Sequence, residues 1–242
     1  MVCAMKEYPK IIFMDLEGTL LKKEYKLDNG KVAPSAWTVL AKYLGEECYI
    51  EEEKTKEKWL KGEYSGYVEW MRDTINIHKK YNLKYDVFKR VIDSVEIKKG
   101  VRKSIDEFRS NGAITAIITG GFKALADRVQ RELKIDHALC GCEYFFDDRT
   151  GYIEHFNLLP SDEKGKVDFM KLLLNEYKFG KKDCVFIGDG KNDVHLAKSV
   201  GLAIALDAQK ELKEVSNIII DQGPNKEDFY DVAIAIKNNF IV

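Results

Sequence analysis

The sequence has no apolar run long enough to span a membrane and no excess of charge of either sign. No apolar stretch approaches the roughly 18 residues that a membrane helix needs. The 39 Lys and Arg residues nearly balance the 40 Asp and Glu residues, which gives a net charge of -1. Neither a basic surface for nucleic acid nor an acidic tail for a basic partner is therefore indicated. Residues 1–10 are too short and too polar for a secretory signal, so we expect a cytoplasmic protein that binds neither nucleic acid nor membranes.

Cysteine and histidine are also scarce. Five cysteines and four histidines are scattered along the chain. An odd number of cysteines without an export signal favours reduced thiols over a disulfide framework. Cys140 and Cys142 lack the wider gap that is usual in metal-binding pairs. The histidines are not spaced as metal ligands, and we expect them on the surface or in loops.

Two nucleotide-binding signatures are absent. No G-x-x-x-x-G-K-[ST] motif occurs, which disfavours a P-loop kinase. No G-x-G-x-x-G follows the first apolar run, which disfavours a nicotinamide-dependent enzyme.

Short apolar runs alternate with helical patterns over most of the 242 residues. The runs predict strands at 10–15, 113–119, 183–189, 201–206 and 217–221, with helices at 104–110, 123–133 and 166–177. A hairpin is indicated at 143–156. This alternation predicts an α/β protein with a Rossmann-like, three-layer parallel-sheet core.

The stretch from about residue 25 to 97 differs from the rest. It is charged, helical in pattern and rich in aromatic residues, without a convincing buried strand. We interpret it as an all-helical cap domain that is inserted into the core and closes over a substrate. The predicted division is a core of residues 1–22 and 98–242 and a cap of residues 23–97.

Carboxylates follow two of the predicted buried strands. Asp15 and Asp189 each end a strand, and ligands bind beyond the carboxyl ends of parallel strands. Asp15 is the candidate nucleophile, because a carboxylate can attack phosphorus and form an aspartyl-phosphate. Asp189, with Asp193 nearby, is a candidate ligand for Mg²⁺, a cation that prefers carboxylate oxygens and substrate phosphate.

Other residue types complete a phosphate site. Glu17 lies two residues after Asp15 and is a candidate proton donor and acceptor. Thr119, Gly120 and Gly121 follow a strand and precede a helix, where backbone N–H groups can bind phosphate. Lys164 stands at a helix start, against the preference of the helix dipole, and is a candidate to neutralise phosphate charge. Lys166 is the competing candidate.

These blocks, in this order, resemble the four motifs of the haloacid dehalogenase-like phosphohydrolase superfamily. The inserted helical cap, Gly120-Gly121-Phe122, Lys164-Gly165 and Gly188-Asp189-Gly190-Lys191-Asn192-Asp193 are most similar to its phosphoserine phosphatase branch. The resemblance implies that Asp15 is phosphorylated and that Glu17 is the acid/base, its backbone carbonyl reaching Mg²⁺. It further implies phosphate binding by Thr119 and Gly120, charge neutralisation by Lys164, Mg²⁺ binding by Asp189, and contributions from Asn192 and Asp193.

Substrate recognition in the cap is less complete in this resemblance. Glu24 matches a glutamate that meets the amino group of phosphoserine. Arg72 is the nearest candidate for the arginine that holds the serine carboxylate, although it lies about two residues out of register. Glu17 also replaces the usual aspartate of the first motif.

The implied function is a Mg²⁺-dependent phosphomonoester phosphatase that acts through an aspartyl-phosphate, on O-phosphoserine or a similar small phosphorylated metabolite. Two alternatives stay open. One is a phosphotransferase that passes the phosphoryl group to an alcohol such as homoserine, and the other is an inactive phosphate-binding scaffold. A homodimer is compatible with the sequence, which does not determine the oligomeric state.

Overall fold

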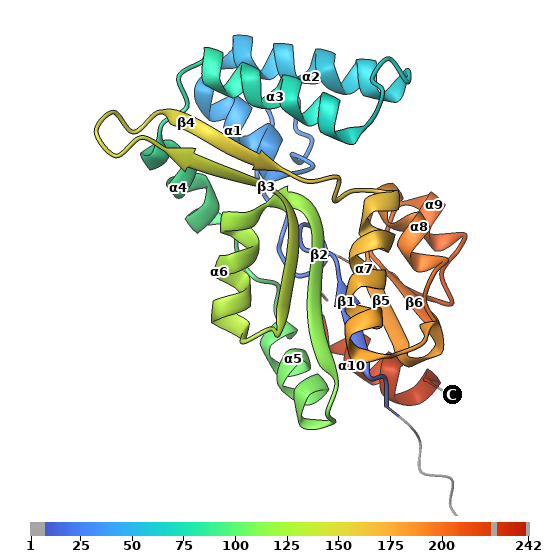
Figure 1. The fold of residues 1–242 in the computed structure, drawn as a ribbon. Helices are drawn as coiled ribbons and strands as arrows, with labels where there is room; N and C mark the ends of the chain where they lie inside the picture. Colours follow the sequence, from blue (N-terminus) through green and yellow to red (C-terminus); the bar gives the residue numbers. More distant parts are fainter. Residues whose placement is uncertain (1–7, 224–226, 241–242) are drawn as a thin grey trace, which may run out of the picture.

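The computed structural model describes residues 8–223 and 227–240, and over these residues the chain forms a three-layer α/β fold (Figure 1). The described strands make one seven-stranded sheet in the order β4-β3-β2-β1-β5-β6-β7. Every neighbouring pair is parallel except β3 and β4. The predicted Rossmann-like core is thus confirmed. The strands are β1 (Ile11–Met14), β2 (Ile114–Phe122), β3 (His137–Phe146), β4 (Ile153–Leu158), β5 (Cys184–Gly188), β6 (Leu202–Leu206) and β7 (Ile218–Ile220).

Helices cover both faces of the sheet because the central strands are apolar on both sides. Along β1, Ile12 and Met14 belong to one hydrophobic cluster, and Ile11 and Phe13 belong to the other. One face carries α5 (Val101–Ser110), α6 (Lys123–Leu133) and α10 (Tyr230–Asn239). The other carries α7 (Lys164–Tyr177), α8 (Val194–Ala197) and α9 (Lys210–Lys213), with short 3₁₀ turns η1 (Lys181–Asp183) and η2 (Lys191–Asp193).

The predicted hairpin is confirmed, but its first strand is longer than expected and also pairs with β2. β3 begins parallel to β2 and then pairs antiparallel with β4. β2 also runs further than expected, through Gly120 and Gly121 to Phe122, with a register shift after Thr119. The glycine pair is therefore an irregular end of the strand instead of a loop between strand and helix.

Five helices lie between β1 and β2, and the four before α5 form the region that we call the cap. These four are α1 (Ala36–Leu44), α2 (Glu46–Leu60), α3 (Tyr67–Lys80) and α4 (Tyr85–Ser94), and they sit over one end of the sheet (Figure 1). No helix among the described residues is both long and apolar enough to cross a membrane. The division into a core of 1–22 and 98–242 and a cap of 23–97 stays a prediction, with residues 1–7 outside the described range.

The chain enters and leaves the cap through two segments that lie side by side. The Lys22 N–H donates to the Glu96 carbonyl at 2.9 Å, and the Lys98 N–H donates to the Leu20 carbonyl at 2.9 Å. We call these paired segments, residues 20–22 and 96–98, the neck. It fixes where the cap emerges from the core.

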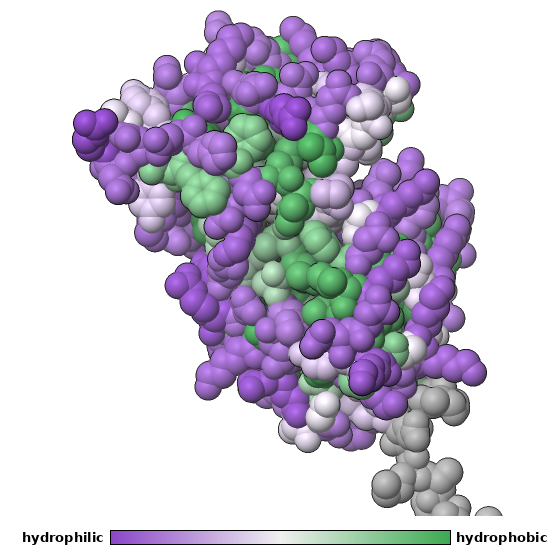
Figure 2. Space-filling view, viewed as in Figure 1, coloured by the Kyte–Doolittle hydropathy of each residue, from purple (hydrophilic) through white to green (hydrophobic). Residues whose placement is uncertain are grey.

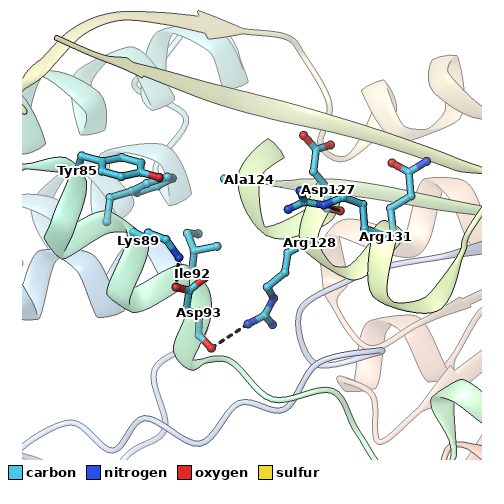
Figure 3. A pocket seen from close by; sticks show the side chains of 10 residues that line it. Tyr85, Lys89, Ile92, Asp93, Ala124, Asp127, Arg128 and Arg131 are labelled. Atoms are coloured by element: carbon cyan, nitrogen blue, oxygen red, sulfur yellow. Dashed lines mark hydrogen bonds and ion pairs between the residues drawn. The ribbon is translucent and has the colours of Figure 1, made fainter. Parts of the chain in front are cut away.

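A side chain from the core holds the exit from the cap. Arg128 of α6 donates from Nη1 to the Asp93 carbonyl at 2.9 Å (Figure 3). Its Nη2 donates to the Val95 carbonyl. These carbonyls belong to the end of α4, where helical C=O groups lack partners within the helix. An open cavity of about 540 Å³ lies beside this contact, between α4 and α6.

Aromatic packing joins the cap to the sheet. The fully buried ring of Phe122 lies 4.0 Å from Trp37, 5.2 Å from Phe88 and 5.3 Å from Tyr144, measured between centroids. Trp37 and Phe88 belong to cap helices, whereas Phe122 and Tyr144 belong to the sheet. Cap and core therefore share one hydrophobic cluster.

The expectation for histidine is wrong at one position. His78 of α3 is fully buried, with Nδ1 2.9 Å from the Tyr144 hydroxyl and Nε2 3.1 Å from a Glu52 oxygen. Its burial is tolerated because both ring nitrogens have partners. The cysteines that the structure describes are free thiols, as expected, and Cys3 lies outside the described residues.

We predict that Phe122→Ala lowers the free energy of unfolding by about 3–5 kcal/mol, because it leaves a cavity in the shared cluster. The matched control is Phe145→Ala, since Phe145 is 43% exposed, and its cost is expected to be about 1 kcal/mol or less. Urea unfolding monitored by circular dichroism measures both. Equal effects of the two substitutions would contradict a cluster shared by cap and core.

Candidate active site

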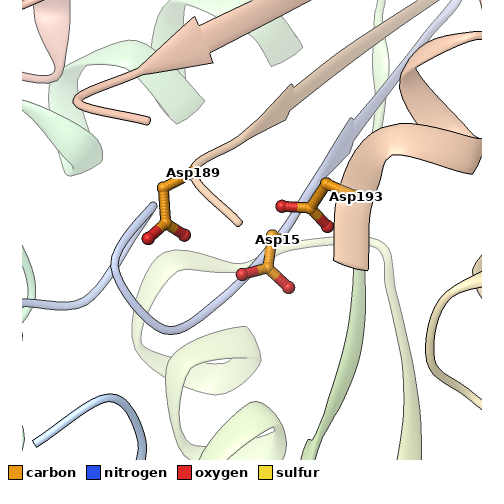
Figure 4. A group of neighbouring side chains, drawn as sticks. All are labelled: Asp15, Asp189 and Asp193. Carbon is orange, nitrogen blue, oxygen red and sulfur yellow. The ribbon is translucent and has the colours of Figure 1, made fainter. Parts of the chain in front are cut away.

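The parallel topology brings three carboxylates together. β1 pairs with β5 in register, Met14 opposite Ile187, so that Asp15 and Asp189 follow neighbouring strand ends. Asp193 lies in η2, four residues after Asp189. One oxygen of each of the three side chains lies within 4.8 Å of the others, and all three residues are buried. Figure 4 shows the three side chains converging from the strand ends and η2.

A buried lysine binds two of these carboxylates. Lys166 Nζ lies 2.6 Å from Asp15 Oδ1 and 2.6 Å from Asp193 Oδ1, and its side chain is fully buried. Burial alone would lower the pKa of Lys166, but the charges of Asp15, Asp193 and Asp162 outweigh it and hold the pKa well above its usual value. The ammonium group therefore stays charged inside the protein.

The prediction that placed Lys164 at the site is wrong in position. Lys164 is exposed on the first turn of α7, and Lys166 is the lysine that contacts Asp15. The physical reason is helical phase, because residues two apart point to opposite sides of a helix. Lys166 is four residues before the buried Met170 and seven before the buried Leu173, which places it on the face toward the sheet.

Asp189 has its own cation. Lys23 Nζ lies 2.7 Å from Asp189 Oδ2, and the Thr19 hydroxyl donates to Asp189 Oδ1 at 3.3 Å. The turn after Asp15 can approach Asp189 because Gly18 has a φ of +89° and no side chain. A Cβ atom at Gly18 would meet Asp189 Oδ2 at 2.3 Å.

The predicted phosphate-binding segment lies at the same end of the sheet. The buried Thr119 hydroxyl accepts a hydrogen bond from the Gly121 N–H at 3.1 Å. The Tyr67 hydroxyl, from cap helix α3, donates to the Gly120 carbonyl at 2.7 Å. Asn192 Nδ2 donates to Asp162 Oδ1 at 2.7 Å, and the Asp162 side chain lies beside Gly120.

Glu17 reaches from the core to the cap. Its Oε1 accepts a hydrogen bond from the Ala36 N–H at 2.6 Å, at the first turn of α1. Burial raises the pKa of Glu17 to about 7, although the Ala36 N–H and Lys23 oppose the rise. A carboxyl group with such a pKa can both hold and release a proton near neutral pH. The predicted contact of the Glu17 backbone with Mg²⁺ stays a prediction.

The two predicted cap residues for substrate do not line this site. Glu24 pairs with Lys22 at 3.1 Å, and its side chain is 60% exposed. Arg72 is exposed on α3. Glu24 belongs to the irregular segment between β1 and α1, and Arg72 lies on a face of α3 that points away from the cavity.

A cavity of about 260 Å³ opens above the carboxylates. Figure 2 shows a notch on this side, between the cap helices and the part of the core that carries α7, α8 and α9. The lining combines core and cap: Asp15, Glu17, Lys23, Pro34, Ser35, Trp37, Tyr67, Trp70, Met71, Thr119, Gly120, Gly121, Asp162, Asp189, Gly190, Lys191, Asn192 and Gln209. All predicted core site residues except Lys164 and Asp193 therefore line one cavity. Asp193 lies beneath this lining, where Lys166 bridges it to Asp15.

The donor set fits a hard divalent cation. Three carboxylates converge at one point, and oxygen ligands of this kind suit Mg²⁺. Asp15 and Asp189 also line the cavity, so an ion held there would adjoin a bound phosphate.

A sequence model of the haloacid dehalogenase-like hydrolases matches residues 9–201, which include every core site residue that the sequence predicted. The chain belongs to this family. The predicted family is therefore confirmed, together with the prediction that the protein is an enzyme. Family membership also explains why the nucleophile candidate, the phosphate segment, the lysine and the second carboxylate pair occur in this order.

Relatives of this hydrolase are named phosphoserine phosphatases. One from Methanocaldococcus jannaschii is 24% identical over 92% of this chain and 97% of its own length. One from Archaeoglobus fulgidus is 25% identical over 94% of this chain, but the match spans only 60% of that relative. A solved structure titled as a phospho-aspartyl intermediate analogue of phosphoserine phosphatase has the same fold, with a TM-score of 0.74, 20% identity and coverage of 95% and 99%. The predicted resemblance to this branch is thus confirmed.

Several residues of the site were not singled out from the sequence. Lys23 and Asp162 are single charged residues in a chain with many, and no motif marks them. Tyr67 and Trp70 belong to an aromatic-rich stretch, and only the docking of α3 onto the sheet selects them.

We predict that Mg²⁺ stabilises the protein through the carboxylate cluster. At a Mg²⁺ concentration 100 times its Kd, binding adds about 2.7 kcal/mol to the free energy of unfolding. Asp189→Asn is expected to remove this gain, whereas Asp168→Asn is expected to keep it, since the Asp168 side chain is 75% exposed on α7. Thermal unfolding with and without Mg²⁺ measures the difference. A gain that survives in Asp189→Asn would place the ion elsewhere.

Proposed function

We propose that this protein is a Mg²⁺-dependent phosphomonoester phosphatase that acts through an aspartyl-phosphate on Asp15. One observation carries the proposal. Asp15 lies at the floor of a cavity, in contact with a buried ammonium group, beside a carboxylate cluster suited to Mg²⁺ and a phosphate-binding segment. Membership of a hydrolase family and the names of the relatives support it.

In the first step, Asp15 attacks the phosphorus atom of the ester. Lys166 binds Oδ1, so we assign the attack to Oδ2. A bond forms between this oxygen and phosphorus while the bond between phosphorus and the ester oxygen breaks. Glu17 donates its proton to the departing oxygen, a role that suits its raised pKa.

In the second step, Glu17 takes a proton from water as the water oxygen attacks phosphorus. The bond from phosphorus to Asp15 breaks, phosphate leaves, and both carboxyl groups return to their starting states. Lys166 keeps a positive charge beside the reacting oxygens throughout, and the Thr119 segment offers donors to the phosphoryl oxygens. A bound Mg²⁺, held by Asp15, Asp189 and Asp193, would supply further positive charge to offset repulsion between the nucleophile and phosphate.

A small phosphorylated metabolite is the proposed substrate class. The relatives' names make O-phosphoserine the first compound to test. The transfer of phosphate to an alcohol is tested in the same assay by adding homoserine as an acceptor.

The deciding experiment measures phosphate release from a panel of small phosphate esters with Mg²⁺, for the native protein and Asp15→Asn. The native protein is expected to release phosphate and to carry a phosphoryl group on Asp15 during turnover. Asp15→Asn is expected to do neither. Release that persists in Asp15→Asn, or a folded and Mg²⁺-bound native protein that releases nothing, would refute the proposal.

We further predict that Lys166→Met lowers kcat by about 100-fold or more, because it removes a positive charge from the reacting group. Lys164→Met is the matched control and is expected to leave kcat unchanged, since Lys164 is exposed. Circular dichroism in the presence of Mg²⁺ separates lost catalysis from lost folding. A larger loss in Lys164→Met would return the role to Lys164.

A further inference from the structure

The wall of the active-site cavity that residues 34–71 form carries no charged side chain among the described residues. Its lining consists of Pro34, Ser35, Trp37, Tyr67, Trp70 and Met71. The charged lining residues are Lys23, at the start of the predicted cap, and the core residues Asp15, Glu17, Asp162, Asp189 and Lys191. The part of a substrate that projects from the phosphate toward the cap would therefore meet aromatic and apolar surface.

The polar groups of this wall are already occupied. Trp70 Nε1 donates to the Thr55 hydroxyl at 3.1 Å, and the Tyr67 hydroxyl donates to the Gly120 carbonyl at 2.7 Å. Neither donor is left for a carboxylate on the substrate. Apart from the Ser35 hydroxyl, the wall presents ring faces, ring edges and aliphatic atoms.

Packing holds the aromatic wall in place. Trp70 stacks on Trp59, with centroids 5.0 Å apart and planes at 10°, and lies edge-on to Tyr67 at 6.1 Å. Trp37 packs on Phe122 at 4.0 Å. Rings fixed in this way bind an apolar group without losing conformational freedom, which favours affinity.

The two lysines that line the cavity, Lys23 and Lys191, are poorly suited to bind a substrate carboxylate. Lys23 is bound to Asp189 at 2.7 Å. The Lys191 side chain is 67% exposed and 4.0 Å from Glu211, so water would screen its attraction for a substrate carboxylate. Glu24 and Arg72, the candidates for recognising an amino acid, lie outside the lining. A carboxylate group placed against this wall would lose water without gaining a cation, whereas an ammonium group could reach only the core carboxylates of the same cavity, such as Glu17 and Asp162.

We infer that the substrate is a phosphate ester of a small, uncharged apolar or aromatic alcohol, and that Trp37, Tyr67 and Trp70 select it. This inference rests on the phosphatase function proposed above and specifies its substrate class. The cavity volume of about 260 Å³ limits the ester to a small one, below the usual size of drug-binding pockets.

The test compares benzyl phosphate, propyl phosphate and O-phospho-L-serine, which all release an alkyl alcohol and so differ mainly in the group that meets the cap. We expect kcat/KM for benzyl phosphate to exceed that for phosphoserine by about 100-fold or more, because the wall of residues 34–71 offers no cation for the carboxylate of serine. The same order is expected in the Kd values of Asp15→Asn, measured by calorimetry without turnover.

The wall is tested by Trp70→Ala, with Trp70→Phe as the conservative variant. The ratio of kcat/KM for benzyl over propyl phosphate is expected to fall about 10-fold in Trp70→Ala, as one aromatic contact is lost, and to recover in Trp70→Phe. Tyr43→Ala removes an exposed aromatic residue of the cap and is expected to keep the native ratio.

Each outcome decides the inference. Phosphoserine turned over as fast as benzyl phosphate, or bound as tightly by Asp15→Asn, would overturn the inference and leave the phosphatase function standing. An unchanged benzyl-to-propyl ratio in Trp70→Ala would overturn the role of the wall. No hydrolysis of any ester by folded, Mg²⁺-bound protein would overturn both the proposed function and the inference.

Discussion

The site depends on positive charges that balance three buried carboxylates. Asp15, Asp189 and Asp193 are buried within a few ångströms of one another, an arrangement that their mutual repulsion would otherwise disfavour. Lys166 offsets it from inside the protein by bridging Asp15 and Asp193, and Lys23 offsets it from the side of the cavity by pairing with Asp189. Removing one partner of such a buried pair leaves an uncompensated charge, which is strongly destabilising. Positions on β1, β5, η2 and α7 are thus tied to one another by electrostatics as well as by packing.

Two hydrogen bonds tie the cap helices α1 and α3 to this site. Glu17 accepts from the Ala36 N–H of α1, and Tyr67 of α3 donates to the Gly120 carbonyl. The first involves the proposed proton donor, and the second involves the segment that we propose binds phosphate. A glutamate at position 17 extends one methylene further than an aspartate, and it makes its contact with the start of a cap helix. The position of the cap helices therefore affects the positions of Glu17 and of the Gly120 backbone.

Much of the core could be predicted because short stretches of sequence specify its strands and their ends. A buried apolar run that ends in Asp15 or Asp189 predicts a strand end, and parallel pairing then brings the two together without further assumptions. The assignment of Lys164 failed on helical phase, although the apolar residues at 170 and 173 carried enough information to favour Lys166. His78, Glu24 and Arg72 failed for a different reason. His78 and Arg72 lie on α3, and Glu24 lies in the irregular segment before α1. Their surroundings depend on how this part of the chain packs on itself and on the sheet, which no spacing within the sequence specifies.

The neck and the aromatic cluster give the cap two different kinds of attachment. In connectivity the cap is an insertion whose two ends lie together, since the Lys22 N–H donates to the Glu96 carbonyl. A short turn between these two residues could replace the cap and keep the core chain continuous. In packing it is not separable, because excision would uncover Phe122 and Tyr144 at the surface. Exchange of caps between relatives is thus simple at the level of chain topology and demanding at the level of surface chemistry. A transplanted cap would have to bring its own counterparts to Trp37 and Phe88, or the recipient core would expose an adhesive apolar patch.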